Sequence, residues 1–419
     1  MELLRNSVRH YAWGSRTAIR ELTGEPGPAP QPEAELWMGT HPGDPSHVVD
    51  PDGTERSLLD LVSADPERHF GTDIARQWGN RLPFLLKILA AEQPLSIQVH
   101  PSSEQAAAGF AKEEAAGIAR DAAHRNYPDD TSKPELLCAL SEFHALVGFR
   151  AAERTLALLR SIGSSGLARY IDVLARHTDA DGVRELFTTW ITLSEREAEA
   201  LLGDVLASCT ERAAAAGEFA AELRTAVELG AAYPDDLGVL AALLLNRVTL
   251  APGEAIYLPA GNVHSYLYGT GIEILANSDN VLRCGLTPKH VDVPELLRVV
   301  DFSCGEVPVL TGTSDAGTGG PLVYRTDAPE FELSRTDWAD GDADGVELTP
   351  GAPQILVCTR GSVLVRSAGD RAELELRAGN SVWVAANEPA VTVRPLASRA
   401  AQVFRGSPGT APGARPSRS

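Results

Sequence analysis

The chain has 419 residues, of which 43% are hydrophobic, so it is long enough for two or three domains with separate cores. Its formal net charge of −20 argues against nucleic acids and anionic membranes as partners, because both attract basic proteins. The chain starts without an apolar signal segment, its apolar runs are too short to cross a bilayer, and its five cysteines show no CxxC spacing. These features favour a cytoplasmic protein without disulfides.

The first 110 residues are expected to form mainly short strands joined by loops. Leu82–Leu89 predicts a buried strand, in which Lys87 is the only charge. The next segment alternates polar and apolar residues, and the residues on its polar face are Ser96, Gln98 and His100. A polar face opposite an apolar one suggests a β-barrel whose lumen holds a ligand.

Helical patterns dominate the middle of the chain. Residues 103–117 are rich in Ala and Glu and predict one helix. Residues 151–247 show helical periodicity with few strand signals, and we expect four to six helices there, forming an insertion. Ser194 followed by Glu197 predicts a capping box at the start of one helix, and Pro234–Asp236 resembles the first turn of another.

Strands resume at Val248, and a second β region follows a linker-like segment at 311–321. The short strands predicted there are 354–357, 363–366, 374–377, 382–385 and 391–394. They indicate a second all-β barrel or sandwich. Gly379–Asn387 loosely repeats Gly253–Gly261, so the second barrel is either a duplicate that has lost its metal site or a coincidental match.

The predicted organisation has four parts. They are a catalytic metal-binding barrel from 1–150 together with 248–310, a helical insertion at 151–247, a metal-free C-terminal barrel at 322–405 and a disordered tail at 406–419.

Four residues of the first β region are candidate metal ligands. They are Gln98, His100, Glu135 and His264, the last of which follows a strand–turn–strand pattern punctuated by Gly, Pro and Gly. Two nitrogens and two oxygens suit zinc and, less decisively, manganese, iron or cobalt. One carboxylate leaves the metal with net positive charge, which favours polarisation of a carbonyl or hydroxyl oxygen. The alternative is that each is an ordinary polar residue, with Lys133 and Glu135 forming a surface ion pair.

Cations near these segments also suggest a site. Only four of the 37 basic residues are lysines, and Lys87, Lys133 and Lys289 lie within or beside the metal motifs. A compact ammonium that Arg cannot imitate is one explanation, and chance is the other. Arg283 and Lys289 would suit a phosphate, and Arg283 a developing oxyanion, unless both belong to a solvated loop.

The chain resembles the type I mannose-6-phosphate isomerases, which are zinc-dependent members of the cupin superfamily. The segments that carry the resemblance, in family order, are Tyr11–Ser15, Ala34–Gly39, Leu82–Pro101, Lys133–Glu135 and Leu258–Lys289. The resemblance implies a mainly β fold with an α insertion, built from two cupin-type jelly-roll barrels and a helical domain. It also implies a monomeric isomerase that interconverts mannose 6-phosphate and fructose 6-phosphate and so feeds mannose and GDP-mannose metabolism.

The same resemblance implies roles for individual residues. Those that correspond to the ligands of one zinc ion per chain are Gln98, His100, Glu135 and His264. The implied catalytic residues are Arg283, Lys133, Glu273 and Asp279. The implied substrate-binding residues are Trp13, Glu35, Lys87, Ser96, Tyr266 and Lys289. Lys133 and Glu273 are the two candidates for the base that moves a proton between C1 and C2, and Lys289 is the candidate phosphate contact.

One position departs from the family pattern. Many members carry His directly before the Lys-Pro-Glu motif, whereas this chain has Ser132. A mechanism that needs an imidazole there cannot operate, which shifts the role toward Lys133, Glu273 or water. Two other functions stay open, namely a zinc-dependent sugar-phosphate binder without turnover and an iron-dependent cupin oxygenase. A fused nucleotidyltransferase is disfavoured, because no Gly-rich loop precedes a helix.

Overall fold

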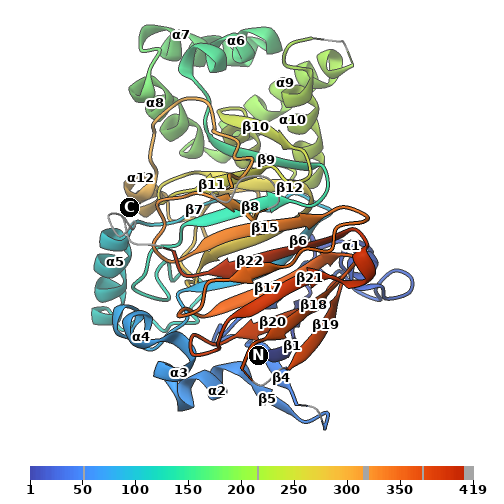
Figure 1. The fold of residues 1–419 in the computed structure, drawn as a ribbon. Helices are drawn as coiled ribbons and strands as arrows, with labels where there is room; N and C mark the ends of the chain where they lie inside the picture. The colour runs from blue at the N-terminus through green and yellow to red at the C-terminus, as the bar shows by residue number, and fades with distance from the viewer. Residues whose placement is uncertain (51, 215–216, 315–319, 370–371, 410–419) are drawn as a thin grey trace, which may run out of the picture.

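The computed structural model describes the whole chain except residues 51, 215–216, 315–319, 370–371 and 410–419. Antiparallel β-sheets form its body, and one group of helices gathers at one end (Figure 1). The fold is therefore mainly β with additional helices, as predicted at this level. The described strands pair into sheets of ten, eight and four strands, and no closed barrel is found among them.

The ten-stranded sheet carries the segments in which the metal motifs were predicted. Its strands are β2 (Ser7–Arg9), β3 (Glu35–Met38), β6 (Phe84–Ala91), β7 (Ile97–Val99), β8 (Glu135–Ala139), β9 (Phe143–Phe149), β10 (Leu245–Leu250), β11 (Ala255–Leu258), β12 (His264–Ala276) and β13 (Leu282–Gly285). Strand β12 is central, because its 13 residues pair with β6, β7, β8 and β9. A register shift between Tyr266 and Tyr268 interrupts the β9 pairing and changes which way the side chains point.

The continuous apolar run of β6 is explained by burial on both faces. Phe84, Leu86 and Ile88 pack into the core between this sheet and the eight-stranded sheet. Leu89 and Ala91 pack into a second core on the opposite face. Lys87 lies on that second face, so the one charge of the run points toward the same side as the predicted site.

The other two sheets hold the second β region. The eight-stranded sheet has the order β14 (Leu322–Tyr324), β15 (Glu332–Trp338), β22 (Ala401–Ser407), β17 (Gln354–Arg360), β20 (Ser381–Val384), β1 (Glu2–Arg5), β4 (His47–Val49) and β5 (Glu55–Ser57). The four-stranded sheet has the order β16 (Val346–Leu348), β21 (Val391–Pro395), β18 (Ser362–Ser367) and β19 (Glu373–Arg377). All five strands predicted in this region are present.

Two features of this region differ from the sequence prediction. Strands β1, β4 and β5 come from the first 57 residues yet pair in the C-terminal sheet, so the segment 1–150 contributes to both β regions (Figure 1). The predicted tail from Gly406 was wrong at its start, because β22 reaches Ser407 and pairs with both β15 and β17. Its buried Phe404 holds the strand in place despite the Gly/Ser-rich composition that follows. Residues 410–419 lie outside the described part of the chain.

The helices are α1 (Ala18–Thr23), α2 (Leu58–Ala64), α3 (Pro66–Phe70), α4 (Thr72–Trp78), α5 (Ser103–Ala115), α6 (Ala152–Ile162), α7 (Ala168–Arg176), α8 (Ala180–Ile191), α9 (Glu195–Ala213), α10 (Ala220–Ala232), α11 (Gly238–Ala242) and α12 (Val293–Val299). Helix α5 lies where it was predicted. In the described part of the chain no helix combines the length and the hydropathy that a bilayer crossing requires.

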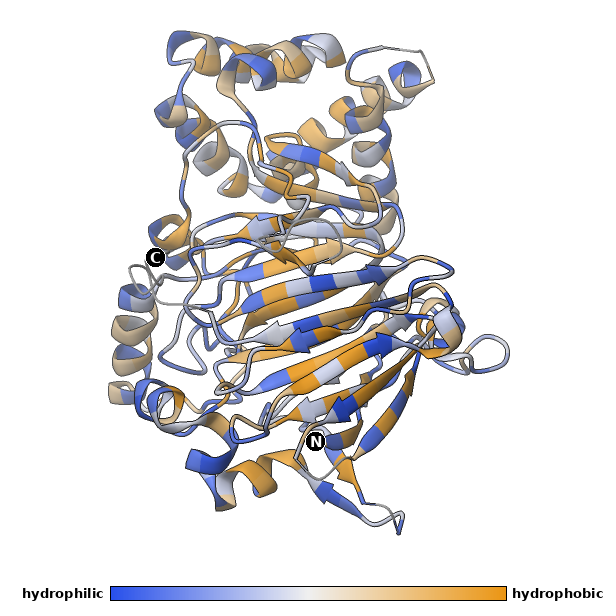
Figure 2. Cartoon of the chain, in the orientation of Figure 1, coloured by the Kyte–Doolittle hydropathy of each residue, from blue (hydrophilic) through white to orange (hydrophobic). Residues whose placement is uncertain are grey.

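The group of helices α6 to α11 packs on β9 and β10 through an apolar core of its own (Figures 1 and 2). The predicted capping box is present, since the Ser194 N–H donates to Glu197 Oε2 at 3.4 Å. The helix predicted to begin at Pro234–Asp236 begins instead at Gly238. Asp235 has φ of 65°, a left-handed conformation that cannot continue a helix.

Candidate metal centre and active site

Three strands bring the predicted histidine and glutamate ligands together. His100 directly follows β7, Glu135 begins β8 and His264 begins β12. Backbone pairing fixes their register, because His264 lies opposite Gln98 and Glu135 lies opposite Leu275. All three side chains are buried, and their ligand atoms lie within 4.8 Å of one another.

Second hydrogen bonds fix the orientation of both imidazoles. His100 Nδ1–H donates to the carbonyl of Asn280 at 2.7 Å, and His264 Nδ1–H donates to the carbonyl of Asn262 at 3.0 Å. In the neutral form of each ring this leaves the lone pair on Nε2, and both of these buried atoms lack a hydrogen-bond partner. This is the arrangement of metal-binding histidines, whose other nitrogen is held by a backbone or carboxylate acceptor.

The carboxylate of Glu135 completes the group, and its buried negative charge would be stabilised by a bound cation. Glu135 Oε1 lies 3.3 Å from His100 Nε2, and its Oε2 lies 3.4 Å from His264 Nε2. Burial lowers the pKa of His100 to about 4, so this ring is neutral at pH 7. Lone pairs on two nitrogens and two oxygens thus face one another in a buried space. A divalent cation fits this donor set, and Gln98, on the strand opposite His264, lies where it could add an oxygen.

A buried charge network lies on the same face of the sheet. Lys87 Nζ is 3.4 Å from Glu35 Oε1 and 3.1 Å from Glu273 Oε2. Trp37 Nε1–H donates to Glu35 at 2.6 Å, and the Tyr266 hydroxyl donates to Glu273 at 2.8 Å. Burial alone would lower the pKa of Lys87, but the two carboxylates outweigh it and raise that pKa, so the lysine is charged. Four predicted substrate or catalytic residues therefore form one connected group.

Replacement of Lys87 by Ala is expected to destabilise the protein by about 3–5 kcal/mol, because two buried carboxylates lose their shared cation. The measurement is the free energy of unfolding in urea. Lys112→Ala is the matched control, since Lys112 is exposed on α5 and its loss should change stability by less than about 0.5 kcal/mol. A Lys87 variant as stable as this control would contradict the ion-pair network.

Arg283 and Lys289 form a second cationic group. Arg283 lies on β13, and Lys289 lies in the segment that follows this strand. Burial lowers the pKa of Arg283, and the charge of Arg283 lowers that of the exposed Lys289. Within the part of the chain that the structure describes, neither side chain forms an ion pair with a carboxylate. Both cations are therefore free to meet an anionic ligand, and the register of Arg283 opposite Gln98 places it beside the metal centre.

His41 is a site residue that the sequence analysis missed. Its Nδ1 accepts the N–H of Gly43 at 3.1 Å, so its Nε2–H points to Asp279 Oδ1 at 3.3 Å. The bond from His41 is the main reason why the pKa of Asp279 is lowered. Trp37 packs edge-on against the ring at 4.8 Å between centroids. The Gly-Thr-His-Pro segment after β3 contains this histidine, but nothing in the sequence links it to Asp279, which lies far along the chain.

Glu330 is a second residue that the sequence analysis missed, and it contacts Ser132, the position that departs from the family pattern. Ser132 Oγ lies 3.0 Å from Ser103 Oγ and 3.4 Å from Glu330 Oε1, while the neighbouring Lys133 Nζ lies 3.1 Å from Glu135 Oε1. Glu330 belongs to the segment that leads into β15, so the C-terminal region reaches the Lys-Pro-Glu motif. Burial raises the pKa of Glu330, and its Oε2 is buried without a partner.

The ionised form of Glu330 should lower stability, which makes Glu330→Gln stabilising at higher pH. Because the folded-state pKa is raised above the unfolded value, the folded protein binds this proton more tightly, and the penalty grows as pH rises through the folded pKa. We expect Glu330→Gln to unfold at a higher temperature than the parent at pH 8 and at a closely similar temperature near pH 4. Thermal unfolding of both proteins at the two pH values is the measurement. A difference between the proteins that does not depend on pH would contradict this account.

Trp13 and Ser96 are the remaining predicted residues. Trp13 is half-buried, stacks on Tyr11 at 5.7 Å between centroids and packs against the apolar core that contains Tyr266. Ser96 directly precedes β7. The structure therefore brings His100, Glu135, His264 and the lysine–carboxylate network to one region, with Asp279, Arg283 and Lys289 on the segment after β12.

Comparisons with known proteins agree along nearly the whole chain. Residues 1–152 match the family described as phosphomannose isomerase type I, catalytic domain. An Escherichia coli (strain K12) protein named mannose-6-phosphate isomerase is 40% identical over 394 residues, covering 94% of this chain and 97% of the relative. The human protein of that name is 29% identical, covering 91% of this chain and 92% of its own.

Solved structures give the same relationship. A mutant of phosphomannose isomerase from Salmonella typhimurium superposes with a TM-score of 0.87 at 36% identity, covering 98% of this chain and all of the other. A holo, zinc-bound mannose 6-phosphate isomerase superposes with a TM-score of 0.86 at 36% identity, covering 98% of this chain and 99% of the other. With the fold, the His–Glu–His group and these relatives in agreement, the chain belongs to the type I phosphomannose isomerase family.

Proposed function

We infer that this protein is a mannose-6-phosphate isomerase, which interconverts mannose 6-phosphate and fructose 6-phosphate. The observation that carries the inference is the buried group in which the Nε2 atoms of His100 and His264, both without a hydrogen-bond partner, face the carboxylate of Glu135. Relatives from bacteria, fungi, plants and mammals that match most of this chain carry this name.

Zinc is the cofactor, and we propose that its ligands are His100, Glu135, His264 and Gln98. Zinc bound there would act as a Lewis acid toward a substrate oxygen without bringing redox chemistry. The Nδ1 bonds to backbone carbonyls keep both imidazoles in the tautomer that this role needs. Lys133, 3.1 Å from Glu135, is proposed to orient the carboxylate and to limit its negative charge.

The reaction moves two protons and leaves the atom count unchanged, because one proton passes from C2 to C1 and another passes from the C2 hydroxyl to the C1 oxygen. A base removes the proton from C2 of the open-chain aldose, an enediol forms, and a proton returns to C1 to give the ketose. Arg283 is proposed to stabilise the oxygen that becomes negative during this transfer, and Lys289 to bind the phosphate. Trp13, Ser96 and Asp279 are proposed to line the substrate pocket.

Lys133 and Glu273 are the two proposed proton-transfer groups. Glu273 is supported by its buried position between Lys87 and Tyr266, where burial raises its pKa and so strengthens it as a base. Glu35 and Lys87 would then hold Glu273 in place. Separate Glu273→Gln and Lys133→Met variants assign the role, because only loss of the base should slow exchange of the substrate C2 proton with solvent.

The finer organisation of the protein is also proposed. The ten-stranded sheet would derive from a catalytic cupin-type jelly roll, formed by 1–150 and 248–310 apart from the N-terminal strands that pair elsewhere. The segment 151–247 would be a helical insertion, and 322–405 a cupin-type unit without metal. The five cysteines are all free, which supports a cytoplasmic protein, and we propose that it acts as a monomer.

The decisive experiment is a coupled assay that follows fructose 6-phosphate formation from mannose 6-phosphate. We expect turnover by the purified protein, loss of turnover with a chelator and recovery when zinc is added back. Absence of turnover in protein shown to contain zinc would leave a sugar-phosphate binder instead. Abundant iron together with substrate-dependent oxygen uptake would overturn the zinc assignment in favour of an oxygenase.

A further inference from the structure

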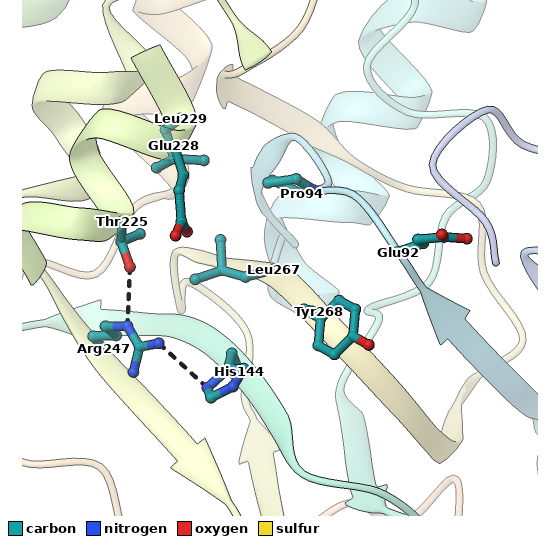
Figure 3. A pocket seen from close by; sticks show the side chains of 9 residues that line it. All are labelled: Glu92, Pro94, His144, Thr225, Glu228, Leu229, Arg247, Leu267 and Tyr268. Carbon is teal, nitrogen blue, oxygen red and sulfur yellow. Dashed lines mark hydrogen bonds between the residues drawn. The ribbon is translucent and has the colours of Figure 1, made fainter. Parts of the chain in front are cut away.

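A cavity of about 430 Å³ lies between helix α10 and the strands β9, β10 and β12 (Figure 3). Its volume falls in the range of about 300–1,000 Å³ that is usual for small-molecule sites. None of its lining residues belongs to the metal centre or to the charge network described above. The isomerase reaction therefore gives this cavity no role.

An arginine in the cavity is held in one orientation by two threonines and a histidine. Arg247 donates from Nε to Thr225 Oγ1 at 2.9 Å, from Nη1 to Thr249 Oγ1 at 3.0 Å and from Nη2 to His144 Nδ1 at 3.3 Å. These acceptors come from α10, β10 and β9. His144 can accept because its Nε2–H points to Glu142, 3.1 Å away.

Arg247 therefore has hydrogen-bonding capacity to spare. A guanidinium has five N–H groups, and three are engaged here, which leaves two for another partner. No carboxylate among the described residues lies within ion-pair distance of it. The three contacts fix the plane of the group before any ligand arrives, which lowers the entropic penalty of binding.

An exposed aromatic ring forms an apolar wall of the cavity. Tyr268 is 55% exposed, the highest value among the exposed large hydrophobic residues in the described part of the chain. It follows the register shift in β12 and precedes Gly269, whose φ of 125° an L-residue would rarely adopt. Its ring is tilted by 31° against that of His144, with 6.5 Å between centroids. Leu267 and Pro94 extend the apolar surface beside it (Figure 3).

The charges of the cavity disfavour an anion. Glu92 and Glu228 line it together with the single cation of Arg247, so a negative ligand would meet a net negative lining. Glu228 points from α10 into the space that Leu267 and Thr225 border (Figure 3). The cavity thus offers hydrogen-bond donors, carboxylate acceptors and an apolar aromatic face.

We propose that this cavity binds a neutral hexose. One face of a pyranose ring carries C–H groups that can pack on Tyr268, as apolar groups do on aromatic rings. Its vicinal hydroxyls both donate and accept hydrogen bonds, so they match the two free N–H groups of Arg247 and the carboxylate of Glu228. The hexose is bound here as a ligand and undergoes no chemical change.

The test is a binding titration on the zinc-loaded, full-length protein with methyl α-D-mannopyranoside, a neutral glycoside whose locked ring cannot isomerise. Tyr268→Ala is expected to weaken binding by about tenfold, since an aromatic contact of this kind contributes about that factor. Tyr268→Phe keeps the ring and should bind within about threefold of the parent. Arg247→Lys keeps the charge but loses the fork of donors, and should also bind about tenfold more weakly.

Several results would overturn the proposal. One is the absence of glycoside binding to the parent protein, and another is equal binding by the parent, Tyr268→Ala and Arg247→Lys. A third is binding of inorganic phosphate that Arg247→Lys abolishes, without binding of the glycoside, since it would make the cavity an anion site. Each outcome is separate from the isomerase assay, so failure here leaves the proposed reaction untouched. Because Tyr268 is exposed, its variants should keep the unfolding temperature of the parent.

Discussion

Replacement of Glu135 by Ala is expected to abolish stoichiometric zinc binding, and isomerase activity with it. Two buried imidazoles would remain, but the only carboxylate among the proposed ligands would be gone. The loss has a second effect, because Lys133, 3.1 Å from Glu135, would lose its carboxylate partner beside the metal site. We expect zinc affinity to fall by more than about 100-fold, beyond the usual effect of altering a group that only supports a ligand.

Zinc content after dialysis, measured by mass spectrometry beside turnover of mannose 6-phosphate, tests this. Glu135→Gln is informative as a second variant, since it keeps the shape and one oxygen but removes the charge. Glu104→Ala, on the exposed face of α5, is the matched control and should retain both metal and activity. One zinc per chain in Glu135→Ala would remove Glu135 from the ligand set.

Arg283→Ala is expected to reduce kcat by about 100- to 1,000-fold while zinc stays bound. The guanidinium is half-buried, pairs with no carboxylate in the described chain, and lies on β13 opposite Gln98. A fixed cation there is available to a developing oxyanion, and removal of one such group commonly lowers turnover by this factor.

The measurements are kcat, KM and zinc content for the same preparation. Arg298→Ala is a suitable control, because Arg298 is paired with Glu295 on α12 and has no part in the proposed chemistry. Arg283→Lys should fall between the parent and Arg283→Ala, since it restores charge without the planar fork. Unchanged kcat in Arg283→Ala would exclude a role in stabilising the transition state.

The site could be predicted from sequence where its residues stand in recognisable local patterns. Gln98 lies on β7 and His100 directly follows it, while Glu135 and His264 each begin a strand next to a turn. The scarcity of lysine in the sequence singled out Lys87 and Lys133 as candidate site residues. Both form ion pairs with carboxylates in the structure. Local patterns were informative because each of these residues lies on or directly beside a single strand.

What could not be predicted depends on pairing across long distances. The carbonyls of Asn280 and Asn262 fix the tautomers of the two histidines, yet a backbone carbonyl leaves no trace in a sequence. His41 meets Asp279, and Glu330 meets Ser132, only because separate segments pack together. Strand β22 was missed because its Gly and Ser favour a loop in isolation, while two neighbouring strands hold it in the sheet.

The pairing of the first strand with the C-terminal sheet has a consequence for biosynthesis. Asn6 donates to Ser381 at 2.8 Å across 375 residues of sequence, and β1 pairs with β20. During translation the edge of β1 that pairs with β20 therefore stays unpaired until almost the entire chain has left the ribosome. Contacts of such long range slow folding and expose strand edges to aggregation, so recovery of active protein should depend on chaperones more than its stability would suggest.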